Sequence, residues 1–218
     1  KSPTFSRLLR IGLIGAGLCS SLFFGATSGS DVALPFKVAY IIEPLKELRD
    51  LALGEAARQG YTLKAYTDLV AICDQIDNGT LSSHEFECDL MEVSLPCTRE
   101  TVMAIHNHGE LQSLDEHPEG FLFADARFRL VGAVKPAAVF NEMTGEHDQS
   151  DGTHRAVARK FHLLGYYVNI TDRLPSCFCG DRTDRSRWFL IAFLAPGPSF
   201  DLVSYCSKEH HAAAPILD

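Results

Sequence analysis

Residues 9–17 read Leu-Arg-Ile-Gly-Leu-Ile-Gly-Ala-Gly, a short apolar run that ends in two closely spaced glycines. The run predicts a buried first strand, and glycines after a strand let the backbone turn tightly and approach a ligand. A basic start followed by apolar and small residues up to Ala26 is also typical of a signal peptide. The rest of the chain favours the strand, because strand and helix patterns alternate along it.

The alternating patterns predict both the architecture and the position of a ligand site. Strands are expected at 36–42, 62–66, 89–94, 137–140, 166–170 and 188–194, helices at 18–26, 44–60, 121–134 and 152–164, and a helical turn at 69–76. This rhythm predicts an α/β fold with a largely parallel sheet and helices on both faces. Ligands bind such sheets at the carboxyl ends of the strands. The candidates that follow strands are Gly15, Gly17, Glu43, Asp68, Pro96, Cys97, Asn141 and Glu142.

Composition excludes several classes of protein. The 218 residues are 46% apolar and carry 20 basic against 28 acidic side chains, a net charge of −8. That balance excludes collagen, coiled coils and disordered tails. It also argues against a domain that grips nucleic acid mainly by bulk charge, although a local basic patch remains compatible with it. Six arginines are candidates for phosphate contacts, namely Arg127, Arg129, Arg155, Arg159, Arg173 and Arg182. For most of them, a place on a solvent-exposed face of a helix or loop is the simpler explanation.

Cysteine usage bears on compartment and metal binding. Seven cysteines without a regular framework favour a reducing compartment, either cytoplasm or nucleoid, or the nucleus in a eukaryote. We expect no metal site, because Cys177-x-Cys179 lacks the paired C-x-x-C spacing of zinc sites. We also expect no membrane span, because the apolar stretch after Arg10 is short and interrupted by glycine and serine.

Two features describe an adenosine site next to a thiol. Gly15-x-Gly17 follows the first strand, and Glu43 ends the second, 26 residues beyond Gly17. An acidic side chain there can accept hydrogen bonds from both ribose hydroxyls of a dinucleotide or of S-adenosylmethionine. Pro96-Cys97 follows the strand expected at 89–94 and would place a thiol, which is a nucleophile when ionised, beside that cofactor.

Taken in order, these segments resemble the motifs of the cytosine-C5 methyltransferases. The first motif, F-x-G-x-G, is similar to Leu13-Ile-Gly15-Ala-Gly17, and the fourth, D-L-x-x-x-x-P-P-C, is similar to the segment from Asp89 to Cys97. The other matching stretches are Glu43, 66–72, 135–143, 162–168 and 180–189. Each motif is weak alone, but their order and spacing over residues 10–194 are hard to obtain by chance.

The resemblance implies a Rossmann-like fold, S-adenosylmethionine as cofactor and DNA as substrate. The cofactor would lie against Leu13, Gly15, Gly17, Glu43, Asp68 and Pro96. Cys97 would add to C6 of cytosine, Glu142 would be the acid at N3, and Arg185 and Arg187 would hold the base carbonyl and a nearby phosphate. The target base would have to leave the helical stack, because its C6 face is inaccessible in a duplex.

The acid position admits two alignments. The family's sixth motif ends in Glu-Asn-Val, whereas this chain has Asn141-Glu142-Met143. Aligned without a gap, Asn141 takes the acid position; aligned on the segment that follows, Glu142 takes it. We favour Glu142, because an asparagine cannot deliver a proton to N3.

The resemblance also sets the expected organisation and the alternatives. We expect a catalytic domain over 1–195 and a tail over 196–218 that leads towards a target-recognition region absent from the chain. A second protein chain would supply that region. One alternative is a weak or inactive methyltransferase-like protein that binds cofactor or a partner, and another is an NAD(P)-dependent Rossmann oxidoreductase, although Ser20 stands where its third glycine would be. RNA also remains open as the substrate.

Overall fold

The computed structural model describes residues 8–15, 36–93, 118–144, 153–175 and 186–196. At 36, 118–124, 143–144, 153–156, 171–175 and 186–188, only the backbone is described. The helix expected over 18–26 lies outside the described residues, and so does the segment that carries Pro96 and Cys97.

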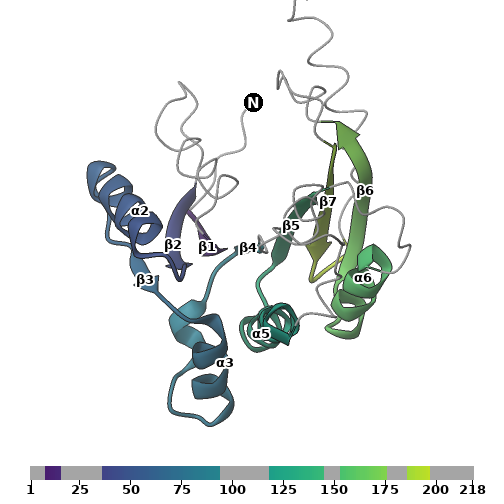
Figure 1. The fold of residues 1–218 in the computed structure, drawn as a ribbon, viewed down its shortest axis with the longest axis horizontal. Helices are drawn as coiled ribbons and strands as arrows, with labels where there is room; N and C mark the ends of the chain where they lie inside the picture. Colours follow the sequence, from purple (N-terminus) through teal and green to yellow (C-terminus); the bar gives the residue numbers. More distant parts are fainter. Residues whose placement is uncertain (1–7, 16–35, 94–117, 145–152, 176–185, 197–218) are drawn as a thin grey trace, which may run out of the picture.

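Within the described residues, seven strands form one sheet in the order β3-β2-β1-β4-β5-β7-β6 (Figure 1). Their bounds are β1 Leu9–Ile14, β2 Phe36–Ile42, β3 Lys64–Tyr66, β4 Leu90–Val93, β5 Ala138–Thr144, β6 Tyr167–Pro175 and β7 Ser186–Phe193. Strands β1 to β5 pair in parallel, whereas β7 is antiparallel to both β5 and β6. The predicted, largely parallel sheet is therefore confirmed. Dinucleotide-binding folds commonly have the strand order 3-2-1-4-5-6. This sheet differs from that order because the antiparallel strand β7 lies between β5 and β6.

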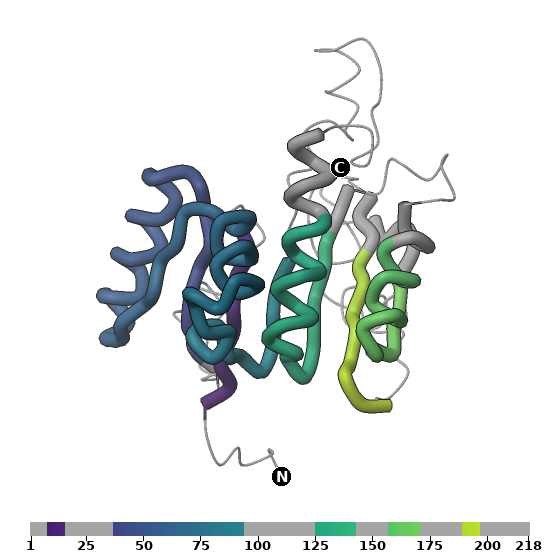
Figure 2. Tube along the Cα trace, turned by 90° about the horizontal axis from the view of Figure 1, so that it is seen from below, coloured from purple at the N-terminus to yellow at the C-terminus, as the bar shows by residue number. Residues whose placement is uncertain are grey.

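Helices cover both faces of the sheet, as predicted. The described helices are α2 Lys46–Arg58, α3 Leu69–Asp77, α5 Pro118–Val134 and α6 Thr153–Leu163, with one 3₁₀ turn, η1 Ser83–Phe86. Figure 2 shows α3, α5 and α6 side by side, and their buried residues share the larger core cluster. Helix α2 packs on the opposite face, where its alanines join a smaller cluster with β1 and β2.

The apolar face expected on α2 is only partly buried. The residues with the apolar helical spacing are 45, 48, 51, 52, 56 and 57; of these, Leu51 is 70% exposed and Leu45 is 57% exposed. The buried residues of α2 are Ala52 and Ala56. Small alanine side chains allow the helix to lie close to β1 and β2, so the longer leucines on the neighbouring positions remain in solvent.

A close approach between β1 and β2 depends on Gly12. The parallel register skips one residue here, so that Ile11 pairs with Val38 but Gly12 pairs with Tyr40. The Tyr40 ring is fully buried and packs edge-on against Phe86, with ring centroids 5.3 Å apart. A Cβ on Gly12 would lie 2.2 Å from the Tyr40 Cζ atom, so only glycine leaves room for this ring.

The expected extent of the fifth strand is wrong. The sequence pattern ends this strand at Phe140 and places Asn141 and Glu142 after it, whereas β5 continues to Thr144. Among the described residues, its parallel pairing with β4 runs as far as Phe140, opposite Glu92. The antiparallel partner β7 goes on pairing as far as Thr144, opposite Arg187, and this keeps the later residues extended.

Candidate functional site

The carboxyl ends of β1, β2 and β3 meet at one edge of the sheet. Ile14 of β1 pairs with Ile42 of β2, which pairs in turn with Tyr66 of β3. Beyond these positions, the Gly15 amide donates to the Ile42 carbonyl at 2.8 Å, and the Glu43 amide donates to the Tyr66 carbonyl at 3.0 Å. The ladder thus carries Gly15 and Glu43, two of the predicted cofactor residues, to adjacent places on that edge.

Gly15 turns the chain away from β1 in a conformation that favours glycine. Its φ of 97° lies in the left-handed region, where a side chain would be strained. The preceding Leu13 is fully buried in the smaller core cluster and anchors the strand. Gly17 lies outside the described residues, so the second glycine of the pair stays a prediction.

The Glu43 carboxylate is held close to the backbone at the end of β2. The residue is only 5% exposed, and its Oε1 accepts from the Leu45 amide at 2.8 Å. Arg49 of α2 donates from Nη1 to the Glu43 carbonyl oxygen at 2.7 Å. These contacts fix both the side chain and its peptide, and a carboxylate fixed at a strand end suits a ligand that presents hydroxyl donors.

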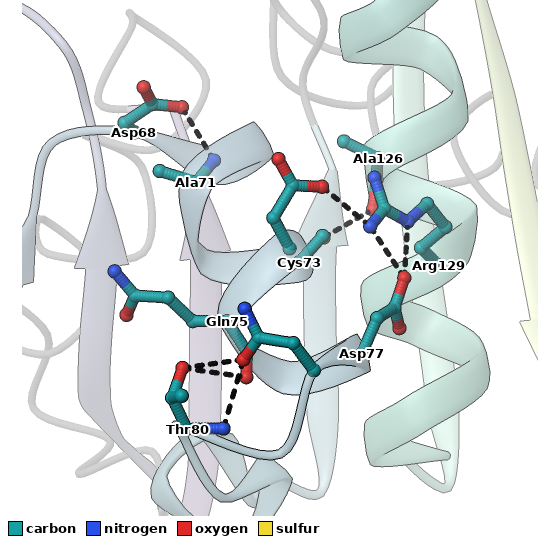
Figure 3. Close-up of polar contacts among 10 residues, drawn as sticks. Asp68, Ala71, Cys73, Gln75, Asp77, Thr80, Ala126 and Arg129 are labelled. Carbon is teal, nitrogen blue, oxygen red and sulfur yellow. Dashed lines mark hydrogen bonds and ion pairs between the residues drawn. The ribbon is translucent and has the colours of Figure 1, made fainter.

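Asp68 begins α3, and this accounts for its observed contact. The side chain is exposed, and its Oδ1 accepts from the Ala71 amide at 3.0 Å, a helix N-cap (Figure 3). An aspartate satisfies one of the otherwise unpaired amides of a first helical turn. Asp68 follows β3 on the same edge as Gly15 and Glu43. The adenine contact that the resemblance implies for it stays a prediction.

Polar contacts join α3, the helix that Asp68 begins, to α5. Arg129 of α5 donates from Nη2 to Asp74 Oδ1 at 2.8 Å and to Asp77 Oδ2 at 2.5 Å (Figure 3). Hydrogen bonds to these two aspartates raise the pKa of Arg129. The Cys73 thiol donates to the Ala126 carbonyl at 3.1 Å within the same interface. Arg129, a candidate for phosphate contact, instead forms ion pairs within the protein.

The two candidate acids on β5 lie on opposite faces of the sheet. Asn141 is fully buried, and its Oδ1 accepts from Arg127 Nη1 of α5 at 3.1 Å. Successive side chains of a strand alternate between faces, so Glu142 projects away from α5. Glu142 is half-buried. The backbone of Arg187 pairs with Thr144 at this end of β5, and only the backbone of Arg187 is described.

Two buried charged residues were not identified from the sequence. Arg127, another candidate for phosphate contact, is 1% exposed, so the interpretations of it as a phosphate contact or as part of a solvated face are both wrong. Glu92 is fully buried in the middle of β4. The sequence did carry a sign that Glu92 is buried, because it is the one charged residue within the apolar run Leu-Met-Glu-Val. Arg127 stands two positions before Arg129 on the same helix, so the sequence alone could not show which of the two arginines is buried.

The two thiols that the structure describes are poor nucleophiles. Burial raises the pKa of Cys73 to about 11 and that of Cys88 to about 11. Cys88 also contacts the Tyr40 hydroxyl, with 3.5 Å between Sγ and the oxygen. Both therefore stay protonated near neutral pH, and protonated thiols do not attack. The candidate nucleophile Cys97 lies outside the described residues, as do Pro96 and Arg185.

The described residues form no cluster of three or more side chains suited to hold a metal ion. None of the described helices is long and apolar enough to cross a membrane. The Cys177 and Cys179 pair lies outside the description.

Comparison with known proteins adds fold-level relatives. No protein-family model matches the sequence, and no curated protein matches it significantly. Among solved structures, S. pombe Dnmt2 methyltransferase is similar over 94% of this chain and 55% of its own, with a TM-score of 0.60 and 14% identity. The Entamoeba histolytica methyltransferase EhMeth is similar over 88% and 54%, with a TM-score of 0.57 and 14% identity.

A third relative, an E. coli prophage protein described as a DNA modification methyltransferase, is similar over 85% of this chain and 46% of its own, with a TM-score of 0.56 and 16% identity. The chain thus spans about half the length of these structures. Identities this low relate folds alone. The seven described strands, the antiparallel β7 between β5 and β6, and the helices on both faces give the chain the Rossmann-like fold seen in these methyltransferase structures.

Proposed function

We propose that this chain transfers a methyl group from S-adenosylmethionine to C5 of cytosine in DNA through a covalent adduct at Cys97. A second chain supplies target recognition. The observation that carries the proposal is the edge formed by Gly15, Glu43 and Asp68 on a methyltransferase fold. The structural similarity to a protein described as a DNA modification methyltransferase, together with the ordered motifs through residue 189, supports cytosine in DNA as the target.

The residues at this edge fit the cofactor chemically. Gly15 has no side chain and a positive φ, so a ligand can approach its backbone closely. The fixed Glu43 carboxylate is an acceptor that matches the two hydroxyl donors of a ribose. S-adenosylmethionine, when bound, supplies an electrophilic methyl group. Gly17, Asp68 and Pro96 complete the proposed site, beside the buried Leu13.

The chain's own residues prepare the base. The Cys97 thiolate adds to C6 of cytosine, while Glu142 donates a proton or a hydrogen bond to N3. C5 gains electron density and accepts the methyl group; loss of the C5 proton then restores the C5–C6 double bond and expels the thiolate. Arg185 and Arg187 hold the base carbonyl and a nearby phosphate. The burial of Asn141 against Arg127 supports Glu142, rather than Asn141, in the acid role.

Cofactor binding is tested by calorimetry with S-adenosylhomocysteine. Glu43→Gln keeps an acceptor for the Leu45 amide but removes the charge that would hold the ribose. A hydrogen bond to a charged group is worth about 1.5–3 kcal/mol, which corresponds to a roughly 10- to 100-fold weaker affinity. The matched control is Glu47→Gln, an exposed carboxylate in the first turn of α2, and it should leave the affinity unchanged. Equal affinities in both variants would place the cofactor elsewhere.

Methyl transfer is tested with labelled cofactor, duplex DNA and a candidate recognition chain. We expect label in 5-methylcytosine with the wild type, none with Cys97→Ala, and unchanged transfer with the control Cys88→Ala. Parallel reactions with transfer RNA test RNA as the alternative substrate. A fluorescence titration with NADH tests the alternative that the protein is an NAD(P)-dependent oxidoreductase. Label in RNA alone would contradict DNA as the substrate, and binding of NADH without binding of S-adenosylhomocysteine would contradict the methyltransferase proposal.

A further inference from the structure

Helix α5 places a charged side chain inside the core, directly against the strand that carries Glu142. Arg127 is 1% exposed and Asn141 is fully buried, and the two are joined by the 3.1 Å hydrogen bond from Arg127 Nη1 to Asn141 Oδ1. The Asn141 Nδ2 atom is also buried, and among the described residues it has no hydrogen-bond partner.

This contact lies beside the junction of two kinds of pairing on β5. Among the described residues, the register between β4 and β5 runs as far as Glu92 opposite Phe140, and the pairing between β5 and β7 continues to Thr144 opposite Arg187. The bond from Arg127 reaches β5 at Asn141, the residue that follows Phe140. It is therefore placed to hold the strand from the α5 side, immediately before Glu142.

From this arrangement we propose that Arg127 is a positioning residue for the reaction. By holding Asn141 from the α5 side, it fixes the backbone of β5 and thereby aims Glu142 from the opposite face at the cytosine ring. The inference rests on the proposed function, and it adds a residue that does not itself touch substrate or cofactor.

A purely stabilising role explains the pair poorly. Removing a guanidinium from water is costly, and replacing buried ionic groups with apolar residues of similar size often stabilises a protein. The buried Asn141 amide group without a partner adds a further cost. An arrangement that is expensive in stability and lies next to a candidate catalytic residue is expected where placement matters.

The test replaces the pair with apolar side chains of similar volume, Arg127→Met together with Asn141→Leu. The matched control is Arg129→Met, which removes an arginine of the same helix whose ion pairs reach α3 instead of β5. Thermal unfolding reports stability, calorimetry reports affinity for S-adenosylhomocysteine, and hydrogen exchange reports the peptide covering 138–144. Steady-state kinetics with DNA and the recognition chain separate kcat from KM.

We expect the double variant to remain folded with wild-type affinity for S-adenosylhomocysteine and for DNA, while kcat falls about 10- to 100-fold. Amide exchange at 141–144 should rise at least tenfold. The Arg129→Met protein should keep wild-type kcat and wild-type exchange at these positions. A stable double variant with unchanged kcat and unchanged exchange overturns the positioning role alone. Failure of the wild type to methylate any nucleic acid instead overturns the proposed function, and this inference falls with it.

Discussion

Substitution of Gly12 by alanine tests the packing of β1 against β2, the strands that lead to Gly15 and Glu43 at the proposed cofactor site. The new Cβ would lie 2.2 Å from Cζ and from the hydroxyl oxygen of Tyr40, and 2.7 Å from Cε1. Ordinary contacts begin near 3.4 Å, so the ring must move by roughly 1 Å. It has little freedom to do so, because Tyr40 is fully buried and packs against Phe86.

Overpacking of this kind costs about 1–3 kcal/mol, and replacing a strand glycine by alanine returns about 0.5–1 kcal/mol of backbone entropy. Because the fully buried Tyr40 cannot yield, the cost should lie in the upper part of its range, and we expect Gly12→Ala to lower the free energy of unfolding by about 1–2 kcal/mol. The melting temperature should fall by about 2–8 °C for a chain of this size. Calorimetric and urea unfolding would measure both quantities.

The control is Gly54→Ala in α2, where no atom lies within 4 Å of the added Cβ. Alanine is the better helix former by about 1 kcal/mol, so this variant should become more stable. Adding Tyr40→Leu should relieve the Gly12→Ala cost and give a positive coupling in a double-mutant cycle. A neutral or stabilising Gly12→Ala, or a cycle without coupling, would refute the account of how β1 and β2 pack.

Four further outcomes follow from the described contacts. Cys73 and Cys88 should resist iodoacetamide at pH 8 in the native protein and react fully in denaturant, as peptide mass spectrometry would show; rapid native labelling would contradict their burial. Both thiols have a pKa raised from 9.0 to about 11 in the folded state, so their contribution to stability should be intact below pH 9 and be lost as pH rises towards 11, which urea titrations would detect. Asp68→Ala removes an N-cap and should lower the free energy of unfolding by about 1 kcal/mol, whereas Asp68→Asn should cost far less. Arg129→Met should lower stability by about 1 kcal/mol at low salt and by less in 1 M NaCl, because its side chain is 29% exposed; an equal loss at both salt concentrations would argue against ion pairing.

The strand edge could be predicted because its signals are local. An apolar run followed by glycine predicts a buried strand and a turn, and the structure places Gly15 and Glu43 side by side in this way. The helix expected over 152–164 is confirmed within one residue at each end by α6, and the helical turn expected over 69–76 is the nine-residue helix α3.

The features that escaped prediction depend on partners distant in sequence. β5 runs past Phe140 because β7, more than 40 residues later, continues to pair with it. Arg127 and Arg129 have the same local surroundings, yet one faces β5 and the other faces α3, and only the packing of α5 separates them. The exposed Leu51 has a similar origin, because α2 makes its contact through Ala52 and Ala56.

The central claim is that Cys97 attacks a cytosine held beside the cofactor edge. It is tested most directly by incubating the protein and its recognition chain with S-adenosylmethionine and DNA that carries 5-fluorocytosine, followed by peptide mass spectrometry. Fluorine at C5 cannot leave as the proton does, so the adduct should be trapped. The account predicts a peptide in which Cys97 carries the methylated fluorocytosine nucleotide, lost in Cys97→Ala and strongly reduced in Glu43→Gln. DNA that is methylated at cytosine without any adduct at Cys97, or an adduct at another cysteine, would contradict the account.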